Sequence, residues 1–475
     1  MESLLMTYDE LSLSPGFSVL CSGTDRGFSS VSIDSRKILP GALFVALTGT
    51  AVDGHSFIEA ALKAGASGIM AAKSRLESFN IVSLAKARNK TLLAAENTLT
   101  GLQNAAAIYL RKFPKLIKIA ITGSAGKTTT KEIAAAVISR EKKVICNSGN
   151  LNSETGLPLS VFNVREEHEA GIFEAGMNRR GEIAELAGVL NPDIALITNV
   201  GSAHIGILGS RQAIAEEKKQ IFSRFNGTQK ALIPAEDEFK DFLAANVAGK
   251  IIFYGQDSFA QLESCRSLGL AGTEIFWAGE KINFPLPGAF NFKNALAALA
   301  IARELSVSDK SAAEGLRSVK PLFGRGEIFN GKVTLIRDCY NSNPESLEAA
   351  LSYCDSVEWP GRKVYIIGSM LELGGISEDA HRQMGLLLSR SNAEMVFLYG
   401  AETEAAAEQL TAGGKKYFKT VKMDELKQAL GSFIKQGDLV LLKGSRGCAL
   451  EELTPVITGD EVRAANVNGT GGQNC

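Results

Sequence analysis

The sequence lacks the features that mark several common classes of protein. Its 475 residues carry a net charge of −1 and its pI is near 6.5, so the composition favours neither nucleic acid nor an anionic membrane surface as a partner. No apolar run approaches the roughly 18 residues of a spanning helix. The acidic start lacks the basic and apolar regions of a secretory signal. We therefore expect a cytoplasmic protein with no nucleic acid partner and no stable membrane insertion.

The sequence also has few cysteines, and they form no recognisable pairs. Seven are scattered along the chain, none stands in a C-x-x-C motif, and their number is odd. This pattern argues against a disulfide framework and against a structural zinc site. It indicates free thiols in a reducing compartment, which agrees with a cytoplasmic location.

Apolar runs of the β type alternate with alanine-rich helical stretches along most of the chain. The first kind includes "IALITNV" (194–200), "KVYIIG" (363–368) and "DLVLLKG" (438–444); the second includes "TKEIAAAVISR" (130–140) and "ESLEAALSYC" (345–354). Nearly continuous apolar strands separated by helices predict an α/β fold whose parallel sheets are covered on both faces.

The length allows about three domains of the usual size. Two stretches suggest boundaries between them, "RKFPK" (111–115) and "KPLFGRG" (320–326). The polar, glycine-rich end of the chain, from about residue 464, is expected to be disordered. We predict a smaller N-terminal α/β domain over 1–114, a central domain on a parallel sheet over 115–322, and a Rossmann-like C-terminal α/β domain over 323–475.

An apolar stretch runs directly into a glycine turn in "LIKIAITGSAGKTTTKEI" (116–133). The full nucleotide-binding signature has one more glycine, separated by four residues from the Gly-Lys pair, and Ile121 stands there instead. The turn could therefore be a decayed nucleotide site, a structural turn, or a shorter kind of phosphate loop. A strand directly before it and Lys-Thr directly after it favour the third interpretation.

The residues of this loop suit an anion. Gly123 and Gly126 let backbone N–H groups approach a phosphate, and the helix that follows adds the positive end of its dipole. Lys127 would reach the outer phosphates, and the hydroxyl of Thr128 would hold Mg²⁺. The loop predicts an ATP site made by Gly123, Ser124, Ala125, Gly126, Lys127, Thr128 and Thr129.

The tract "TGSAGKTTTKE" (122–132) resembles the ATP loop of the Mur ligases, the ATP-dependent amide-forming enzymes of peptidoglycan synthesis. Further landmarks of that family follow in order across the three expected domains. "SIDSRKILPGALFVALTGTAVDGHSF" (32–57) resembles the segment that holds the UDP end of the substrate, which implies Ser35 and Arg36. "GNLNSETGLP" (149–158) resembles the loop that contacts the sugar–peptide substrate and the transferred phosphate. That resemblance implies Asn150, Asn152, Ser153, Glu154 and Thr155.

The resemblance also implies two Mg²⁺ ions. Glu174, at the end of an apolar strand, suits a second ligand beside Thr128. His204 matches the family's histidine ligand of the second ion, although imidazole is an unusual ligand for Mg²⁺. The family's K-x-x-I-F lysine, which is carbamylated, matches Lys218, and the neighbouring Lys219 leaves the choice open. A carbamate would turn this ammonium into an anion with two oxygens, which Mg²⁺ accepts.

One position departs from the family pattern. "LPGAFNFKNALAALA" (286–300) resembles a Gly-x-His-Asn-x-x-Asn-Ala stretch, but Phe290 stands where the family has histidine. Asn291 and Asn294 keep their places and are implied as nucleotide contacts. If the missing histidine orients ATP, its replacement changes the affinity for nucleotide.

The last third of the chain carries the remaining landmarks. "FGRGEIF" (323–329) places Arg325 in the family's Gly-Arg position at the domain hinge, where a guanidinium suits bidentate pairing with the outer phosphate. In "IRDCYNSNPESLEAA" (336–350), Asp338 would accept hydrogen bonds from the ribose. An Asn-x-Asn-Pro turn is usually only a turn. Placed directly after a strand, it is implied to face nucleotide and substrate through Tyr340, Asn341 and Asn343.

Two segments distinguish between members of the family. "IIGSMLELGGISEDAHRQMG" (366–385) and "LLKGSRGCALEE" (441–452) resemble the member that adds D-alanyl-D-alanine. The Asp-Asn-Pro-Arg tetrapeptide of the third-residue-adding member, in its diaminopimelate-using form, is absent from the sequence. Lys443, Ser445 and Arg446 are then implied to receive the carboxylate of the dipeptide.

The resemblance implies a ligase that phosphorylates the terminal carboxylate of UDP-N-acetylmuramoyl-tripeptide with ATP. The amine of D-alanyl-D-alanine would then displace the phosphate. The catalytic set would be Lys127, His204, Lys218 and Arg325. We expect a monomer whose C-terminal domain closes on ATP. The nearest alternatives are the third-residue-adding ligase and the folate polyglutamate ligase, which use another amine. More distant are an ATPase that forms no amide and a binding protein with a decayed site, which Phe290 favours.

Overall fold

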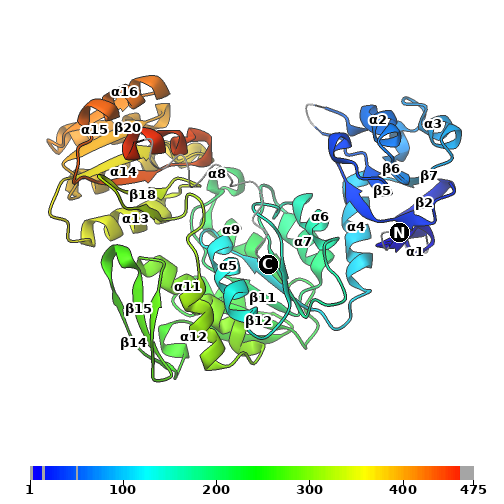
Figure 1. The fold of residues 1–475 in the computed structure, drawn as a ribbon, viewed down its shortest axis with the longest axis horizontal. Helices are drawn as coiled ribbons and strands as arrows, with labels where there is room; N and C mark the ends of the chain where they lie inside the picture. Colours follow the sequence, from blue (N-terminus) through cyan, green and yellow to red (C-terminus); the bar gives the residue numbers. More distant parts are fainter. Residues whose placement is uncertain (1–3, 13–15, 50–51, 460–475) are drawn as a thin grey trace.

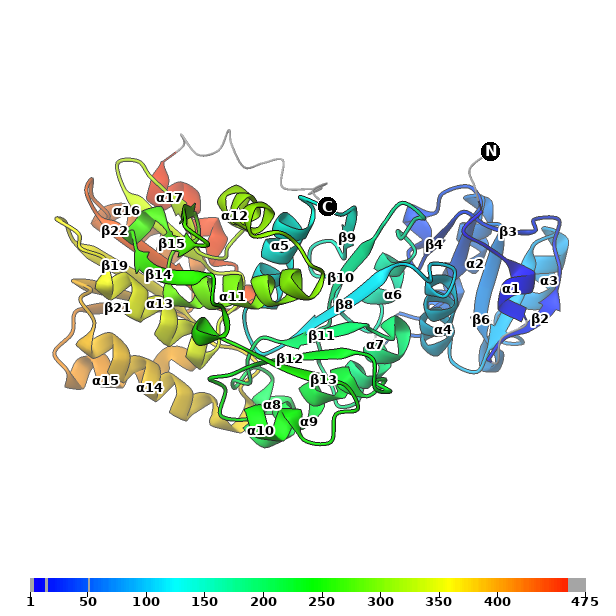
Figure 2. The same ribbon diagram turned by 90° about the horizontal axis from the view of Figure 1, so that it is seen from below.

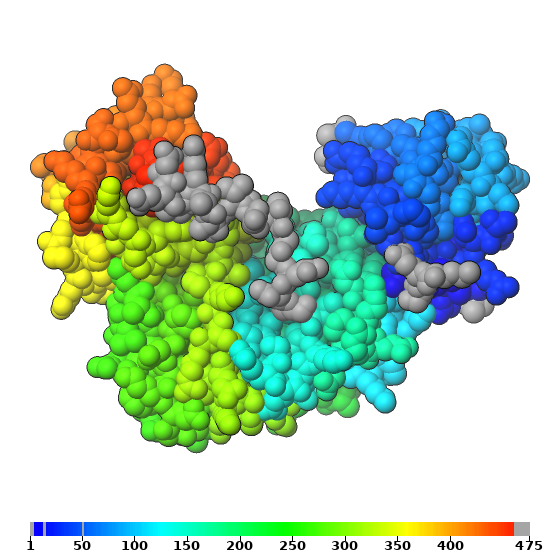
Figure 3. All heavy atoms as spheres, in the orientation of Figure 1, coloured from blue at the N-terminus to red at the C-terminus, as the bar shows by residue number. Residues whose placement is uncertain are grey.

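The computed structural model describes residues 4–12, 16–49 and 52–459. The chain forms three α/β parts that follow one another in sequence (Figures 1 and 2). The first part lies at one end, the central part in the middle, and the C-terminal part at the other end. A space-filling view shows the molecule hollowed above the central part, between the first and last parts (Figure 3). The predicted α/β fold in three domains is confirmed. The tail expected to be disordered lies outside the described residues.

The first sheet has the strand order β2-β7-β6-β5-β4. Strand β2 runs antiparallel to β7, and the other pairs are parallel. Every residue of β5, β6 and β7 is buried, as expected for strands covered on both faces. The strands are β2 (Ser18–Cys21), β4 (Ser30–Ser32), β5 (Ala42–Val45), β6 (Gly68–Ala72) and β7 (Thr91–Ala95), with β1 (Met6–Thr7) and β3 (Gly27–Phe28) as a separate pair. The helices are α1 (Tyr8–Ser12), α2 (Ile58–Lys63), α3 (Ile81–Ala87) and α4 (Thr98–Leu110).

Helix α4 joins the first sheet to the central domain. The side chain of Asn97 caps it by accepting hydrogen bonds from two backbone N–H groups of its first turn. One hydrophobic cluster continues from Leu43 of the first sheet through Leu102 of α4 to Leu186 of the central domain. The first domain is thus packed against the central one at this helix. The exact boundaries that we predicted between domains stay predictions.

The central sheet has the order β13-β12-β11-β8-β10-β9, and all its pairs are parallel. Strand β8 (Ile117–Thr122) lies between β10 (Ala170–Glu174) and β11 (Ile194–Ile197). The carboxyl ends of these three strands therefore meet at one edge, where open α/β sheets bind their ligands. The other strands are β9 (Val144–Cys146), β12 (Lys230–Pro234) and β13 (Lys250–Tyr254). The helices are α5 (Lys127–Ile138), α6 (Gly156–Val161), α7 (Glu182–Leu190), α8 (Ile205–Leu208), α9 (Arg211–Lys219) and α10 (Lys240–Ala244).

A three-stranded antiparallel sheet is an addition to the expected architecture. It consists of β14 (Leu262–Ser267), β15 (Thr273–Trp277) and β16 (Glu280–Phe284). The chain leaves it into α11 (Ala289–Glu304) and α12 (Asp309–Ser318), which both pack against α5. The long apolar helix α11 therefore covers the helix that begins at the phosphate loop.

The C-terminal sheet has the order β17-β18-β22-β19-β20-β21. Strand β17 is antiparallel to β18 and the remaining pairs are parallel. Its strands are β17 (Glu327–Phe329), β18 (Thr334–Asp338), β19 (Lys363–Gly368), β20 (Met395–Tyr399), β21 (Tyr417–Thr420) and β22 (Leu439–Lys443). Its helices are α13 (Pro344–Ser356), α14 (Ser377–Arg390), α15 (Glu404–Ala412), α16 (Met423–Phe433) and α17 (Thr454–Thr458). Across the described ranges, no helix is long and apolar enough to cross a membrane.

Candidate active site

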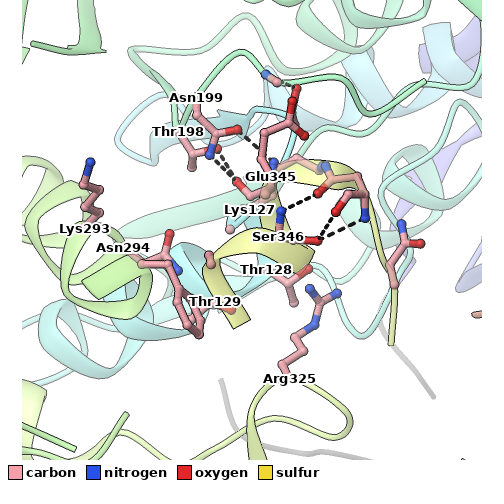
Figure 4. A pocket seen from close by; sticks show the side chains of 18 of the residues that line it. Lys127, Thr128, Thr129, Thr198, Asn199, Lys293, Asn294, Arg325, Glu345 and Ser346 are labelled. Atoms are coloured by element: carbon pink, nitrogen blue, oxygen red, sulfur yellow. Dashed lines mark hydrogen bonds between the residues drawn. The ribbon is translucent and has the colours of Figure 1, made fainter. Parts of the chain in front are cut away.

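A cavity of about 760 Å³ lies between the central and C-terminal domains (Figure 4). That volume suits a ligand of nucleotide size. Both domains contribute to its wall. The predicted site residues that line it are Ser124, Ala125, Gly126, Lys127, Thr128, Thr129, Asn150, Asn152, Ser153, Glu174, His204, Asn291, Asn294, Arg325, Asp338, Tyr340, Asn341, Asn343 and Lys443.

The phosphate loop joins β8 to α5, and its two glycines are required by the backbone. Gly123 has φ 149° and Gly126 has φ 80°, conformations that residues with a side chain rarely adopt. A Cβ atom at Gly123 would also lie 1.8 Å from Oγ1 of Thr198, and one at Gly126 would lie 2.3 Å from Oδ1 of Asn294. The loop can therefore take this tight form only with glycine at both positions.

Asn199, two residues after β11, holds the phosphate loop through its side-chain amide. Its Oδ1 accepts a 3.0 Å hydrogen bond from the backbone N–H of Ala125, and its Nδ2 donates to the Ala125 carbonyl at 3.0 Å. Thr198 donates to the same carbonyl at 2.6 Å. The sequence analysis did not single out Asn199. Asn199 comes just after an apolar strand, and Glu174 stands at the end of another. This position could have identified Asn199 as a candidate.

Two cations face the cavity without carboxylate partners. Nζ of Lys127 donates to the carbonyl of Gly123 at 2.8 Å. Burial and the neighbouring Arg325 guanidinium lower the pKa of Lys127, while Glu174 opposes that shift. Arg325 lies over the ring of Tyr340 at 4.0 Å. Among the described residues, Lys127 bonds to a backbone carbonyl and Arg325 contacts an aromatic ring, and neither forms an ion pair with a carboxylate. A phosphate group would supply the missing negative charge.

Thr128 and Glu174 meet at the carboxyl ends of β8 and β10. The hydroxyl of Thr128 donates a 2.6 Å hydrogen bond to Oε2 of Glu174, and Asn152 donates to Oε1 at 2.7 Å. The buried amide of Asn147, which the sequence analysis missed, holds the backbone of Glu174 through two hydrogen bonds of 2.9 and 3.0 Å. The hydroxyl and the carboxylate are oxygen donors of the kind that Mg²⁺ prefers.

His204 faces the C-terminal domain. Its Nδ1 lies 3.2 Å from Oε2 of Glu372, and the contact holds the pKa of that carboxyl below its usual value. Both residues are in the left-handed region, with φ 66° each. Within the described ranges, no group of three His, Cys, Asp or Glu side chains could hold a metal by itself. Phosphate oxygens, water or a modified lysine would have to complete any metal site here.

Lys218 is buried, with 1% of its surface exposed, although it does not line the cavity directly. Burial and the charge of Lys127 hold the pKa of Lys218 well below its ordinary value. Lys219, by contrast, donates to the carbonyls of Phe242 and Ala245 at 2.7 Å each. The structure thus buries the first lysine and ties the second to the region of α10.

Helix α11 supplies the other side of the cavity. Asn294 accepts from the hydroxyl of Thr130 at 3.3 Å and donates to Asn291 at 3.4 Å, while Asn291 donates to the carbonyl of Pro287 at 2.8 Å. Phe290, the departure from the family pattern, is half-buried and lines the cavity. Its side chain is thus among those that a bound ligand would meet.

The C-terminal residues of the site are held by Lys443, whose side chain is buried at the end of β22. Its Nζ pairs with Oδ2 of Asp338 at 3.1 Å and donates to the carbonyl of Asn341 at 2.8 Å. Asn343 caps α13 by accepting from the N–H of Ser346 at 2.9 Å. The turn after β18 is therefore fixed by its own contacts, and the carboxylate of Asp338 remains at the cavity wall.

Six predicted substrate residues do not line the cavity. In the first domain, Arg36 forms two 2.9 Å hydrogen bonds with Asp34, beside Ser35. In the C-terminal domain, Arg446 pairs with Glu451 at 2.6 Å, and the buried Ser445 accepts from the N–H of Leu371 at 2.9 Å. Arg179 donates a hydrogen bond to Glu154, and Thr155 is the N-cap residue of α6. The roles of these six residues stay predictions.

Comparisons with known proteins agree with this arrangement. Three family models match the chain: "Mur ligase family, catalytic domain" over 28–107, "Mur ligase middle domain" over 121–302, and "Mur ligase, glutamate ligase domain" over 324–446. A relative from Treponema pallidum, named UDP-N-acetylmuramoyl-tripeptide–D-alanyl-D-alanine ligase, is 41% identical, with 96% of this chain and 99% of the relative covered. A relative of the same name from Bacillus subtilis is 35% identical, covering 89% of this chain and 92% of its own.

Solved structures show the same architecture. MurF from Acinetobacter baumannii superposes with a TM-score of 0.83 at 26% identity, covering 95% of this chain and 98% of that one. MurF from Thermotoga maritima in complex with ADP gives a TM-score of 0.76 at 27% identity, covering 90% and 97%. The chain therefore belongs to the Mur ligase family, and within it to the MurF type.

Proposed function

We propose that the protein is an ATP-dependent ligase that joins D-alanyl-D-alanine to UDP-N-acetylmuramoyl-tripeptide in the synthesis of peptidoglycan precursors. The observation that carries this proposal is the meeting of a glycine phosphate loop with Lys127, Arg325 and Asp338 in one cavity between two domains. The relatives named above act on these substrates according to their names, and they match the chain over nearly its whole length.

The residues of the cavity suit transfer of the γ-phosphate from ATP to a carboxylate. The loop N–H groups and Lys127 hold the phosphates, and Arg325 faces the same space from the hinge (Figure 4). The substrate carboxylate takes the phosphoryl group, which gives an acyl phosphate and ADP. The neutral amine of the dipeptide then attacks the acyl carbon, and phosphate leaves as the amide forms. Catalysis here is chiefly positioning and neutralisation of charge.

We propose Thr128 and Glu174 as ligands of one Mg²⁺, and His204 and Lys218 as ligands of a second. The geometry supports the assignment of Thr128 and Glu174, because the hydroxyl oxygen of Thr128 lies 2.6 Å from a carboxylate oxygen of Glu174 beside the phosphate loop. When bound, Mg²⁺ would offset the negative charge that gathers where a carboxylate meets a triphosphate. The second site needs an anionic ligand in place of an ammonium.

Carbamylation of Lys218 would provide that ligand. The neutral amine adds to the carbon of CO₂ and releases one proton to solvent, which leaves an N-carboxylate. Lys218 is buried, and burial and the charge of Lys127 hold its pKa low, whereas Lys219 donates to two backbone carbonyls. These positions support Lys218 as the modified residue.

We further propose that the chain acts in the cytoplasm as a monomer, with the domains bounded as predicted. Ser35 and Arg36 would hold the UDP end of the substrate, and the 150–155 loop would contact its sugar and peptide. The hollow between the first and last domains leaves room for a substrate that extends from one to the other (Figure 3). Ser445 and Arg446 would act on the dipeptide through the loop that they anchor.

The test is phosphate release from ATP with UDP-N-acetylmuramoyl-tripeptide, measured with and without D-alanyl-D-alanine while the product is followed by mass. We expect release that depends on the dipeptide, and a product heavier by that dipeptide less one water. A panel of other amines is the control. Release with another amine in place of the dipeptide would assign the protein to a sister ligase. Release without any amine would contradict the proposed function.

A further inference from the structure

Beside the cavity, the central and C-terminal domains meet at two short loops. Helix α8 (Ile205–Leu208) of the central domain contacts the 3-10 turn Gly374–Ile376 of the C-terminal domain. The backbone N–H of Gly206 donates to the carbonyl of Glu372 at 3.3 Å. The side chain of Ile205 packs against the hydrophobic cores of both domains. The two loops thus form a direct contact between the domains.

Gly206 leaves no room for a side chain at this contact. A Cβ atom there would lie 2.5 Å from the backbone N of Gly374 and 2.7 Å from the carbonyl O of Glu372. The three nearest atoms all belong to the C-terminal domain. The φ of Gly206 is outside the left-handed region, so its own backbone would accept alanine. Glycine is therefore needed at position 206 for the close contact between the two domains, and not for the backbone conformation of α8.

A second contact connects the C-terminal domain with the phosphate loop. Glu345, in the first turn of α13, accepts from the backbone N–H of Ser202 at 2.7 Å and from its hydroxyl at 2.8 Å. The next residue back, Gly201, donates its N–H to Oγ of Ser124 at 2.8 Å. Figure 4 shows Glu345 among the side chains that line the cavity. Two hydrogen bonds to Ser202, the peptide bond between Ser202 and Gly201, and one hydrogen bond to Ser124 therefore connect α13 with the phosphate loop.

We propose that these two contacts are a docking seam, formed by Gly206 with Gly374 and by Ser202 with Glu345, that sets the C-terminal domain on the phosphate loop. Asp338 and Tyr340 enter the cavity from the C-terminal domain, whereas Lys127 and Thr128 belong to the central one. The distance between the two sets depends on how the domains dock. Gly206 and Glu345 are positioning residues, since they act through the placement of other groups. This inference rests on the proposed function only where kcat for ligation is measured.

The experiment introduces a methyl group into the seam. Gly206→Ala should separate the loops by about 1 Å and lower kcat for ligation about 100-fold. The affinity for ADP alone should fall less than kcat does, because the phosphate loop keeps its contacts within the central domain and only the nucleotide contacts of the C-terminal domain depend on docking. Gly375→Ala is the matched control: it adds the same group on the facing turn Gly374–Ile376, where a Cβ atom would meet nothing within 4 Å. X-ray scattering of each protein with ATP and tripeptide should give a larger radius of gyration for Gly206→Ala than for the control.

Glu345→Gln tests the second contact without adding bulk. One Ser202 donor then meets an amide N–H₂ group, and kcat should fall about tenfold or more. Glu348→Gln, one turn further along α13, is the control. Unchanged kcat and unchanged scattering in Gly206→Ala and Glu345→Gln would overturn the seam. Scattering does not depend on amide formation. A wild-type protein that forms no amide would therefore refute the proposed function, and the radii of gyration of the variants would still test the docking seam. Melting temperatures separate either effect from misfolding.

Discussion

Lys218 and Lys219 leave the same turn of α9 for different parts of the fold. The first is buried, and the second donates to two carbonyls at 2.7 Å in and after α10. An i, i+1 pair on a helix points in directions about 100° apart. Because of this geometry, only one of the two lysines can be buried in the same place, and the sequence alone does not show which one.

The two lysines should respond differently to replacement. Lys218→Ala should lower kcat about 100-fold, because it removes the anionic ligand that a carbamate would provide. Lys219→Ala should keep kcat within about threefold, since this lysine caps backbone carbonyls. The modification itself is measured by ¹³C NMR after exchange into ¹³C-bicarbonate. A carbamate signal in wild type and Lys219→Ala, lost in Lys218→Ala, is expected. Its presence in Lys218→Ala would contradict the assignment.

Thr128 offers a test of the first metal site. Thr128→Val keeps the shape of the side chain but removes the hydroxyl that donates to Glu174, and kcat should fall about 10²–10³-fold. Thr128→Ser retains the hydroxyl and should keep most of the activity. Titration of activity with Mg²⁺ provides the measurement. An equal Mg²⁺ requirement in the valine and serine variants would show that the hydroxyl does not hold the ion.

Phe290 should contribute to nucleotide affinity through its ring. It lines the cavity, and stacking of a base on an aromatic side chain contributes about 1–3 kcal/mol. Phe290→Ala should therefore raise KM for ATP about tenfold and leave kcat nearly unchanged, as expected when binding is lost uniformly. Phe290→Tyr preserves the ring and serves as the control. A fall in kcat at constant KM would place Phe290 in the reacting geometry instead.

His381 should make stability depend on mildly acidic pH. It is fully buried; Nε2 accepts from the N–H of Met370 at 3.1 Å, and Nδ1 donates to the carbonyl of Ser377 at 2.7 Å. Burial lowers its pKa from the ordinary 6.5. Below about pH 6.5 the unfolded chain therefore binds a proton that the folded chain does not. The melting temperature should fall as pH decreases through this range.

The His381→Gln variant provides the comparison for that measurement. It removes the titrating group, so the variant should be less stable at neutral pH but should show a flatter decline between pH 7 and about 5. Melting curves in a series of buffers at constant ionic strength give both slopes. Parallel slopes for wild type and variant would assign the acid sensitivity to other groups.

The phosphate loop could be predicted from the sequence because its chemistry is local. Gly123, Gly126, Lys127 and Thr128 are neighbours in the chain, and a strand before them with a helix after them determines how they are presented. The α/β fold was predictable for a similar reason, since apolar strands and amphipathic helices have periods that each segment shows by itself. The antiparallel β14–β16 sheet was not predicted: β14 is largely exposed and β16 alternates between exposed and buried residues, so neither shows the continuous apolar pattern of the parallel strands.

The residues that the sequence analysis missed depend on contacts over long separations. Ser202 and Glu345 are 143 positions apart, and Asn199 reaches the loop from a different strand, 74 positions from Ala125. The sequence by itself determined the phosphate loop, the alternation of strands and helices, and the candidate residues next to strand ends. Only the tertiary structure decided which lysine is buried, which residues share the cavity, and where the domains dock. Those outcomes depend on the order of strands and the packing of domains, which no local pattern encodes.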